Sequence, residues 1–287
     1  MSRKENAASL LNEYAEKFIC PVCGGKVEVV EYKSIICSNR HTFDFAKQGY
    51  INMLTRSMKV NYDKELFAAR QDIIRKHRLY DSLHTRLLEI IKKETANNPQ
   101  SLLLDAGTGE GSHLTRMLEQ TEDPLTGIGI DISKEGIRLA ASKSDTTMWL
   151  VGDLANIPVK NDTLHAIINI LSPANYQEFK RILVENGLMI KVVPGTNYLV
   201  ELRDAILDEQ KRSFTNEETI SLFQEHFTDV WIEELTYTKR LDQAGLQDLI
   251  KMSPLSWNAD QESIQALRNR EYFKITIDLA ILIGKNR

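Results

Sequence analysis

The sequence has no long apolar run, and none of its hydrophobic stretches approaches the roughly 20 residues that a membrane-spanning helix needs. Residues 1–11 are too polar for a secretory signal peptide. Internal repeats and low-complexity tracts are absent as well. With 42% hydrophobic and 26% charged residues, the composition is that of a globular protein, which we expect in the cytoplasm with no membrane partner.

Cysteine is scarce, and its three copies, Cys20, Cys23 and Cys37, are followed closely by His41. A Cys-x-x-Cys pair and then a Cys-x-x-x-His pair are typical of tetrahedral zinc. A disulfide or a thioredoxin-like redox pair would account for the first two cysteines but leaves Cys37 and His41 unexplained. Because four protein ligands leave no open position for a substrate, the predicted zinc is structural.

A segment of about 40 residues around these ligands buries too little surface to fold alone. A structural zinc ion contributes on the order of 10 kcal/mol and would stabilise it. At 287 residues the chain has room for one such module and one ordinary α/β domain. We therefore expect a zinc-binding module over 1–58, connecting helices over 59–98 and a larger domain over 99–287.

The spacing of apolar residues predicts helices over 62–76 and 79–93, and Asn97-Asn98-Pro99 marks the boundary after them. Five apolar stretches then alternate with helical patterns, at 102–104, 126–130, 148–151, 166–171 and 188–193. This rhythm predicts a Rossmann-like α/β fold, in which helices cover both faces of a parallel sheet. Two further stretches, 230–237 and 272–283, should close the same sheet, one of them antiparallel.

The net charge of −4 conceals an asymmetry along the chain. Residues 1–100 contain 17 Lys and Arg against 12 Asp and Glu, whereas residues 101–287 contain 19 against 28. From residue 40 to 86 the cations alternate with aromatic residues such as Phe45, Tyr50 and Tyr62. Such a stretch favours a polyanion with exposed bases, although a solvated helix face explains the same charges without any partner.

A glycine-rich loop follows the first apolar stretch of the larger domain. The strand leads into Asp105, and glycine then occupies every second position, at Gly107, Gly109 and Gly111. Glycine lets the backbone turn sharply and approach a cofactor within contact distance. The loop therefore predicts a nucleotide-like ligand at the end of this strand.

Acidic residues also end the next two predicted strands. Asp131 lies about 20 residues beyond the loop, where a carboxylate can accept the ribose hydroxyls of an adenosine. Asp153 ends the third strand, where it can hydrogen-bond an adenine amino group. A dinucleotide site would use G-x-G-x-x-G to place a pyrophosphate at a helix N-terminus. Here an acid precedes the turn and suits a cationic sulfonium, so the pattern predicts S-adenosylmethionine, with a dehydrogenase as the alternative.

The end of the fourth predicted strand, 169–175, should face the substrate beside the cofactor. Ser172 and Asn175 there could orient a planar base, or could equally cap the helix that follows. After the fifth strand, Pro194-Gly195 makes a sharp turn. Tyr198, just beyond it, could lie over the cofactor or substrate or simply pack.

Zinc ligands, basic helices and a glycine loop follow one another in an order that resembles the RlmA family of 23S ribosomal RNA guanine N1-methyltransferases, which includes the TlrB-type macrolide-resistance enzymes. The resemblance runs almost end to end. Its motifs are Cys20-Pro-Val-Cys23, the segment 37–54, the loop 105–111, Pro194-Gly195 with 199–202, and Met252-Ser-Pro254-Leu-Ser-Trp257. The stretch after His41 is the most specific of them, because neither a generic zinc module nor a generic methyltransferase requires it.

The resemblance implies a class I S-adenosylmethionine-dependent methyltransferase with an N-terminal zinc-finger module that recognises 23S rRNA. The reaction it implies is methyl transfer to N1 of one guanine in an rRNA hairpin loop, by a homodimer that cups the RNA between two zinc modules. Tyr80 and the pair Gly109-Glu110 match cofactor contacts of the family, and Tyr198 stands where some members have a histidine. No residue of the sequence identifies itself as the base that accepts the N1 proton.

Two other functions stay open as alternatives. A small-molecule or protein methyltransferase with a structural zinc module would bind RNA weakly and without salt dependence. A non-catalytic zinc RNA-binding protein would keep the fold without binding the cofactor. The intact Asp105, Gly107, Gly109 and Asp131 argue against this second alternative.

Overall fold

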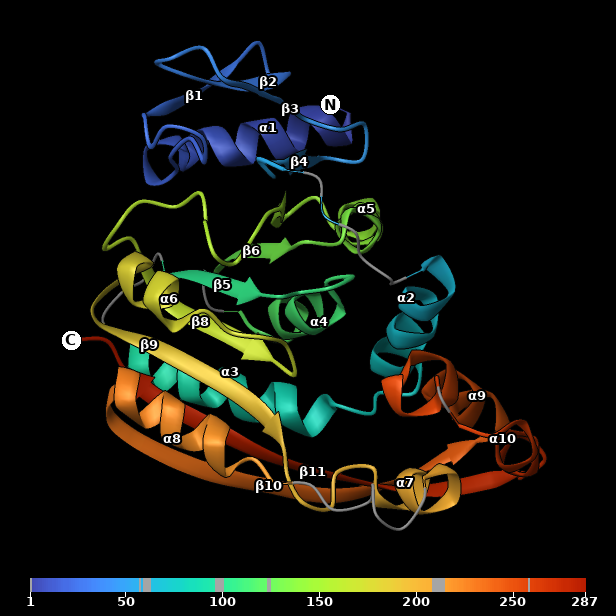
Figure 1. The fold of residues 1–287 in the computed structure, drawn as a ribbon. Helices are drawn as coiled ribbons and strands as arrows, with labels where there is room; N and C mark the ends of the chain where they lie inside the picture. Colours follow the sequence, from blue (N-terminus) through green and yellow to red (C-terminus); the bar gives the residue numbers. More distant parts are fainter. Residues whose placement is uncertain are drawn as a thin grey trace.

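An eight-stranded sheet, with short apolar strands at its centre, forms the larger part of the computed structural model of this chain, which describes residues 2–56, 58, 63–95, 101–122, 125–207, 215–257 and 259–287. The strand order is β10-β11-β9-β8-β5-β6-β7-β4 (Figure 1). The strands are β4 (Tyr50–Asn52), β5 (Leu102–Ala106), β6 (Thr126–Asp131), β7 (Met148–Val151), β8 (Leu164–Ile170), β9 (Leu183–Pro194), β10 (Thr228–Asp242) and β11 (Tyr272–Lys285). All residues of β5 are buried, as expected for a strand that is covered on both faces.

The sheet is parallel from β9 through β8, β5, β6 and β7 to β4. Only β11 reverses direction among these eight strands, since it pairs antiparallel with both β9 and β10. The strands expected from the sequence are therefore confirmed, including one antiparallel strand near the C-terminus. Because β5 to β9 run the same way, the loops that follow them emerge at one edge of the sheet.

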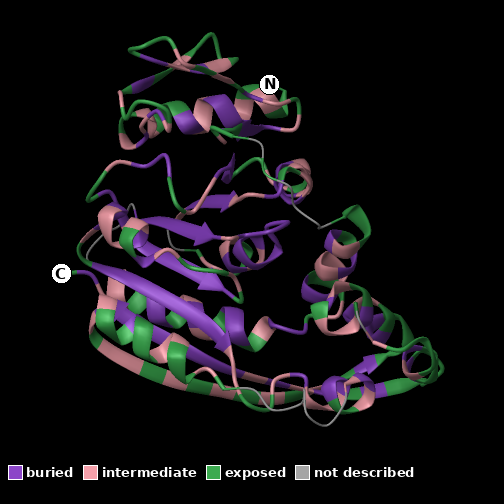
Figure 2. Cartoon of the chain, viewed as in Figure 1, coloured by how far each residue is buried: buried purple, intermediate pink, exposed green. Residues whose placement is uncertain are grey.

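Helices cover both faces of the sheet, and alternate residues of β5 belong to two separate cores. Leu103 packs in the core that includes residues of α3, α4 and α5, whereas Leu102 and Leu104 pack in the core that includes residues of α6 and α8. Figure 2 shows the buried strands between helices whose outer faces are exposed. The helices are α1 (Arg3–Glu13), α2 (Lys64–Gln71), α3 (Asp81–Thr95), α4 (Ser112–Gln120), α5 (Lys134–Lys143), α6 (Tyr176–Ile182), α7 (Val200–Ile206), α8 (Glu217–His226), α9 (Gln243–Met252) and α10 (Gln261–Arg268). Among the described helices, none has the length and apolarity that crossing a membrane requires.

The two helices expected before the larger domain are present with shifted ends. The helix expected over 62–76 is α2, whose last turn, η2 (Asp72–Lys76), is π-helical. The helix expected over 79–93 is α3. Residue 62 and the expected boundary at 97–99 lie outside the described residues, so the division at 59 and 99 stays a prediction.

The N-terminal helix α1 was missed by the sequence reasoning, although its capping box is visible in the sequence as Ser-x-x-Glu. The backbone N–H of Ser2 donates to the Glu5 carboxylate at 2.7 Å, and the Glu5 backbone N–H donates to the Ser2 hydroxyl at 3.3 Å. Ala8 and Leu11 are the buried side of this helix. Because most of its other residues are polar, the short apolar stripe of this helix is hard to recognise in the sequence.

The zinc-ligand segment forms a small antiparallel sheet of β1 (Val27–Val30), β2 (Ser34–Cys37) and β3 (Thr42–Asp44), with α1 beside it (Figure 1). This segment shares a β-sheet and a hydrophobic core with the larger domain. Its last strand, β4, joins the edge of the large sheet by pairing with β7. Leu11 and Phe18 belong to the same buried cluster as Leu104 of β5. The structure therefore places the N-terminal module directly against one face of the sheet.

Because Leu11 lies in this shared core, Leu11→Ala should lower the free energy of unfolding of the whole chain by about 2–5 kcal/mol. Leu222→Ala is the matched control, because Leu222 lies on helix α8 and is 47% exposed, so it should cost less than about 0.5 kcal/mol. Urea unfolding followed by far-ultraviolet circular dichroism measures both changes. Equal effects of the two variants would contradict the shared core.

Candidate functional sites at the zinc ribbon and the sheet edge

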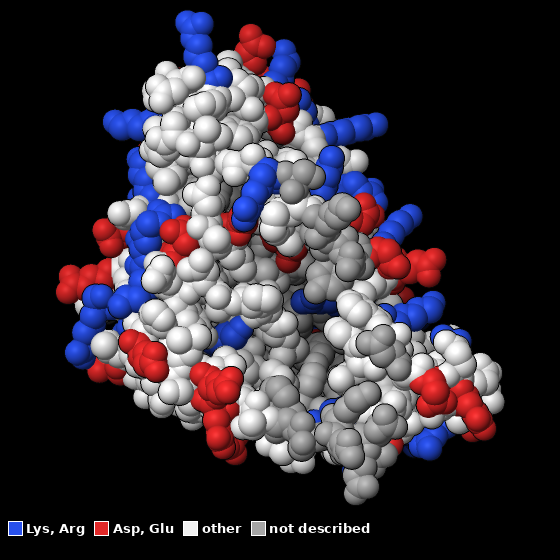
Figure 3. All heavy atoms as spheres, viewed as in Figure 1, with Lys and Arg blue, Asp and Glu red and all other residues white. Residues whose placement is uncertain are grey.

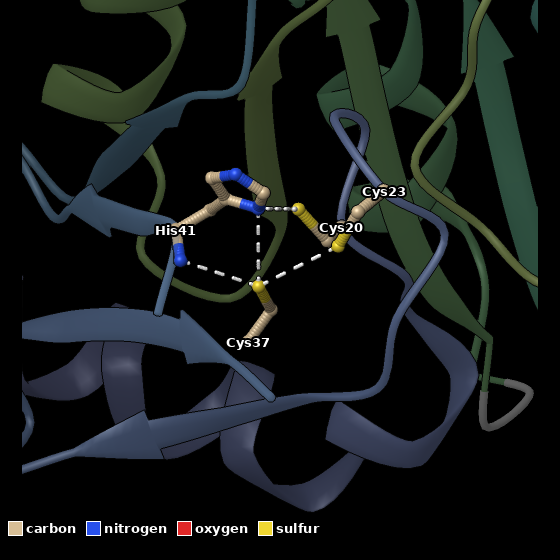
Figure 4. A group of neighbouring side chains, drawn as sticks. All are labelled: Cys20, Cys23, Cys37 and His41. Carbon is tan, nitrogen blue, oxygen red and sulfur yellow. Dashed lines mark hydrogen bonds between the residues drawn. The ribbon is translucent and has the colours of Figure 1, made fainter. Parts of the chain in front are cut away.

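Three thiols and one imidazole converge at the base of the N-terminal hairpin (Figure 4). The ligand atoms of Cys20, Cys23, Cys37 and His41 all lie within 4.8 Å of one another. The Sγ atoms of Cys23 and Cys37 are 3.7 Å apart, and His41 Nδ1 is 3.5 Å from Cys20 Sγ and 3.4 Å from Cys37 Sγ. A tetrahedron with zinc–sulfur bonds of about 2.3 Å has sulfur–sulfur edges of about 3.8 Å. The four predicted ligands thus fit a closed zinc site with Nδ1 as the histidine donor.

The three thiols differ in burial, and the pKa of Cys20 and of Cys23 is shifted in opposite directions. Cys20 and Cys37 are buried, whereas Cys23 is exposed. Burial raises the pKa of the Cys20 thiol, while a hydrogen bond from the Gly25 backbone lowers the pKa of Cys23 to about 6. The His41 backbone N–H also donates to Cys37 Sγ at 3.3 Å. A metal ion bound by all four side chains would have a complete tetrahedral coordination. The arrangement is therefore that of a structural site, with no open position for a substrate.

At the carboxyl edge of the large sheet, the glycine loop fits so tightly that two of its glycines have no room for a side chain. Gly107 has φ of +80°, and a Cβ there would lie 1.9 Å from Ser172 Oγ. Gly111 has φ of +77°, and its Cβ would lie 2.4 Å from the Trp149 ring. Both conformations favour glycine. The packing of the loop against Ser172 and Trp149 therefore requires glycine at both positions.

Two of the predicted acids, the buried Asp105 and the partly buried Asp131, lie at the ends of neighbouring strands. Asp105, at the end of β5, accepts a hydrogen bond from Thr108 Oγ1 at 2.6 Å, and burial raises its pKa to about 7. Asp131, at the end of β6, accepts from the backbone N–H groups of Gly109 at 2.8 Å and Ser133 at 2.7 Å. Burial also raises the pKa of Asp131. Because burial disfavours their ionised forms, a cationic ligand would be stabilised here.

The third predicted acid, Asp153, follows β7, which is the next strand in the sheet. It is less buried than the other two, and Arg56 lies 3.5 Å from one of its carboxylate oxygens. The other oxygen accepts a hydrogen bond from the Ala155 backbone N–H at 2.9 Å. The parallel sheet therefore brings all three acids to one edge, as the sequence predicted.

A cation that the sequence reasoning missed lies over this loop. Arg70, on α2, has its Nε 3.2 Å from the Glu110 carboxylate. A Cβ on Gly109 would be 3.0 Å from a terminal nitrogen of Arg70. Burial alone would lower the pKa of Arg70, but the carboxylates of Glu110, Asp131 and Asp105 outweigh it and raise this pKa. No sequence signal marks Arg70, because only the packing of α2 brings it to the loop.

Glu110 is the most constrained of the acids. Its side chain is fully buried, and its only charged partner among the described residues is Arg70. Neither of its carboxylate oxygens makes a well-aligned hydrogen bond within the described part of the chain. A buried carboxylate in this state is costly unless a cation or donor satisfies it.

The two tyrosines expected at the cofactor meet across the site. Tyr80 precedes α3, Tyr198 precedes α7, and their hydroxyl oxygens are 2.5 Å apart. Burial raises the pKa of both phenols. His113 of α4 packs edge-on against the Tyr80 ring, with ring centroids 5.2 Å apart. The pair is therefore neutral and rigidly held beside the charged loop.

The end of β8 is built around a buried lysine that was also missed. Asn175 accepts a hydrogen bond from the Glu178 backbone N–H at 3.2 Å, so it caps α6, one of the two roles considered for it. Asn169 instead turns inward and donates to the Ala106 carbonyl at 2.6 Å. Lys191 of β9 donates to Asn169 Oδ1 and to the Ser172 carbonyl. Because Lys191 lies in an apolar strand far along the chain, its position at this edge depends on sheet register.

The expected surface of alternating cations and aromatic rings is not present in that form. Phe45, Tyr50 and Tyr80 are buried, with 4%, 5% and 1% of their surface exposed, so their rings cannot stack on bases. Tyr62 lies outside the described residues. Arg70 points into the glycine loop instead of the solvent. These three buried rings belong to the hydrophobic core, because each lies on the side of its element that faces inward.

A doubly covered sheet with parallel central strands, a glycine loop after β5 and carboxylates at three adjacent strand ends define a class I S-adenosylmethionine-dependent methyltransferase, here joined to a zinc ribbon. One family model, described as "RlmA, N-terminal", matches residues 18–59, and another, described as "Methyltransferase domain", matches residues 103–187. The chain belongs to the RlmA family.

Known relatives are similar over nearly the whole chain. The Bacillus subtilis (strain 168) protein YxjB, whose name assigns it provisionally to the 23S rRNA (guanine-N(1)-)-methyltransferases, is 37% identical and covers 93% of this chain and 96% of its own. The 23S rRNA (guanine(748)-N(1))-methyltransferase of Streptomyces fradiae is 31% identical, over 85% of this chain and 87% of its own. A solved S-adenosylmethionine-dependent methyltransferase from Aquifex aeolicus covers 79% of this chain and 100% of its own, with 13% identity and a TM-score of 0.48.

The zinc geometry predicts the effect of chelation. Native protein should contain one zinc per chain, and its three thiols should react with a thiol reagent only after a strong chelator has removed the metal. Metal analysis and thiol titration measure these quantities, and thermal unfolding should shift to lower temperature on chelation. Chelator already saturated with zinc is the control. Three freely reactive thiols in metal-replete protein would rule out the site.

Proposed function

We propose that this protein transfers a methyl group from S-adenosylmethionine to N1 of a guanine in a hairpin loop of 23S rRNA, and that its zinc module recognises the RNA. The observation that carries the proposal is the cluster of carboxylates at the sheet edge, with Asp105 and Glu110 buried and Asp131 partly buried, which favours a cationic ligand such as a sulfonium. The names of the relatives in the RlmA family supply the choice of rRNA and of guanine N1.

The cofactor would lie over the ends of β5, β6 and β7. In this proposal the Asp131 carboxylate accepts hydrogen bonds from the ribose hydroxyls, and the Asp153 carboxylate accepts one from the adenine amino group. Arg70, which is held by Glu110, is available for the carboxylate of the amino-acid part. The bound cofactor supplies an electrophilic methyl group. The full set of proposed cofactor-binding residues is Tyr80, Asp105, Gly107, Gly109, Glu110, Gly111, Asp131, Asp153 and Tyr198, with Arg70 added from the structure.

The target guanine must be accessible at N1, which a base pair would cover. A loop nucleotide is already unpaired, so little energy is needed to bring it to the site. The loop 171–174 is positioned to meet it, because it follows β8 at the same edge and Ser172 abuts Gly107. Positioning of the two reacting atoms about 3 to 3.5 Å apart then lowers the barrier without covalent help from the protein.

The zinc module is suited to RNA by its exposed cations. Lys26, Arg40 and Lys47 are exposed on or beside the zinc-bound hairpin. In Figure 3, Lys and Arg side chains project from the top of the molecule, where Figure 1 draws the N-terminal module, alongside a few Asp and Glu side chains. Cations on a rigid hairpin can contact phosphates without reading sequence. Cytoplasmic location and macrolide resistance, which the sequence and the resemblance suggest, stay predictions.

The alternative substrates are less well supported. A small-molecule or protein methyltransferase has no need of a cationic hairpin fused to the catalytic sheet through β4. A non-catalytic RNA-binding protein would have no reason to retain Glu110, a buried carboxylate without a hydrogen bond among the described residues, because such a group destabilises the fold when no ligand is present. Both alternatives make different predictions in the experiments below.

Methyl transfer can be tested with 23S rRNA from a strain that lacks the gene. Incubation with labelled S-adenosylmethionine should label the rRNA, and reverse transcription should stop beside one guanine, because a methyl group on N1 blocks base pairing. Asp131→Asn should lose labelling and cofactor binding, since it removes the charge that meets the ribose. Asp162→Asn is the matched control, because Asp162 is an exposed residue in the loop before β8.

Labelled RNA without a stop at a guanine would refute the N1 assignment. Labelling of a co-purified protein or metabolite in place of RNA would support the first alternative. Calorimetry that detects no binding of S-adenosylmethionine to the wild-type chain would support the second. Zinc content should be the same in all variants.

RNA recognition by the zinc module predicts salt-dependent binding. The double variant Arg40→Gln/Lys47→Gln should weaken 23S rRNA binding and reduce the slope of log affinity against log salt by about 1 for each charge removed. Filter binding at several salt concentrations measures this slope. Lys93→Gln is the control, because Lys93 is exposed at the end of α3. Two chains per RNA in the same titration would support the homodimer, whereas unchanged binding by the double variant would contradict this role of the hairpin.

A further inference from the structure

Lys191 is a buried amine at the carboxyl edge of the large sheet, near the end of β8 where the substrate is proposed to bind. It lies on β9, with only 5% of its surface exposed. Its Nζ donates to two neutral oxygens, Asn169 Oδ1 and the backbone carbonyl of Ser172. A buried lysine normally pairs with a carboxylate, because desolvation of an isolated ammonium is costly. Neutral partners alone therefore favour the uncharged amine.

Asn169 fixes the orientation of this contact. Its amide nitrogen donates to the Ala106 carbonyl at 2.6 Å and to the Pro173 carbonyl at 3.0 Å. Because both of these partners are acceptors, the amide oxygen has to face Lys191. A neutral amine has two N–H donors and one lone pair, and the two acceptors satisfy both donors. The lone pair of Nζ is then left to accept a proton.

The same contacts place Lys191 next to the reacting region. Ser172, whose carbonyl accepts from Nζ, has its hydroxyl within 1.9 Å of where a Cβ on Gly107 would lie. Ala106, held by Asn169, immediately precedes Gly107. Nζ is thus two contacts away from the glycine loop, under the exposed loop 171–174.

Few titratable groups surround this amine. Its neighbours in the sheet are Asn169 on β8 and Leu282 on β11, neither of which titrates. Asp105 lies one strand further, where it bonds Thr108. From α6, Tyr176 faces the same side of the sheet, and burial raises its pKa to about 12; His226 of α8 packs against Tyr176, with ring centroids 5.3 Å apart. Burial lowers the pKa of Lys191 to about 8.

We propose that Lys191 is the general base that accepts the N1 proton of the target guanine. This inference rests on the proposed function. The N1–H bond breaks and leaves its electron pair on the nitrogen, and the proton forms a third N–H bond on Nζ. This electron pair on guanine N1 forms the new bond to the methyl carbon, and the electron pair of the broken sulfur–carbon bond returns to sulfur. The resulting ammonium then loses its proton to solvent.

The sign of the pH dependence follows from the need for a neutral amine. Below pH 8 the fraction of neutral Lys191 falls, so the transfer rate should fall about tenfold for each pH unit and level off above pH 8. A lysine that only anchors the loop 171–174 as an ammonium would instead be most effective below this pH. The two roles therefore predict opposite profiles.

The full-length protein labelled with carbon-13 at the lysine ε position tests the inference without turnover. One lysine signal should titrate near pH 8, well below the usual value of about 10.4, and should be missing from Lys191→Met and Lys191→Arg. Single-turnover transfer to 23S rRNA is then measured from pH 6.5 to 9.5. At pH 8 both variants should be slower by about 100-fold or more, because neither side chain can accept the proton, while cofactor affinity stays unchanged.

Rescue of the rate by Lys191→Arg would overturn the inference, because an arginine keeps the positive charge but cannot act as a base. A Lys191 signal that titrates at the usual lysine value would overturn it as well. If Lys191→Met fails to fold, the Lys191→Arg variant still assigns the carbon-13 signal of Lys191. The pH dependence of the wild-type transfer rate then decides between a base and a structural anchor. Failure of the wild-type chain to methylate a guanine N1 would instead reject the proposed function. The lysine titration needs no turnover, so it distinguishes failure of the proposed function from failure of the proposal for Lys191.

Discussion

Parallel pairing of β5 with β6, and of β6 with β7, is the constraint on which the cofactor edge depends. Parallel strands end on the same side of a sheet, so residues far apart in the chain become neighbours there. Asp105, Asp131 and Asp153 lie along one edge of the sheet only for this reason. The same register extends through β8 to β9 and brings Asn169 beside Lys191. The proposed cofactor side and the proposed substrate side are therefore two halves of one sheet edge.

Electrostatic imbalance gives this edge its chemical preference. Asp105, Glu110 and Asp131 are largely buried, and Arg70 is the cation that the structure sets against them. Burial makes each additional negative charge costly, which the raised pKa of Asp105 and Asp131 reflects. A ligand with a positive centre would relieve that cost. A few strands away, Lys191 has only neutral partners, so a single edge holds both excess acids and a basic amine.

The N-terminal module is tied to this edge by more than a linker. Its strand β4 extends the large sheet, and Leu11 and Phe18 lie in the same core as the sheet. The metal site holds the ends of the hairpin, whereas the apolar contacts hold the hairpin against the sheet. Folding of the metal-binding segment therefore also fixes the position of its exposed cations relative to the glycine loop.

Local features of the sequence determined much of this outcome. Apolar runs marked the strands of the large sheet, because strands buried on both faces carry few polar residues. The zinc ligands were evident from spacing alone, since a knuckle places its donors within a few residues of one another. The glycine loop and the acids at strand ends were visible for the same reason. By contrast, α1 was overlooked although its capping box stood in the sequence.

Only the tertiary structure decided which distant residues meet. Arg70 and Lys191 carry no local signal, because one is a charged residue on a helix and the other a polar residue in an apolar strand; packing of α2 and the register of β9 give them their partners. Phe45, Tyr50 and Tyr80 were interpreted from the sequence as rings that could meet bases, but they are buried, since their side of each element faces a core. Chain order thus fixes the chemical groups available, and long-range packing decides how they combine.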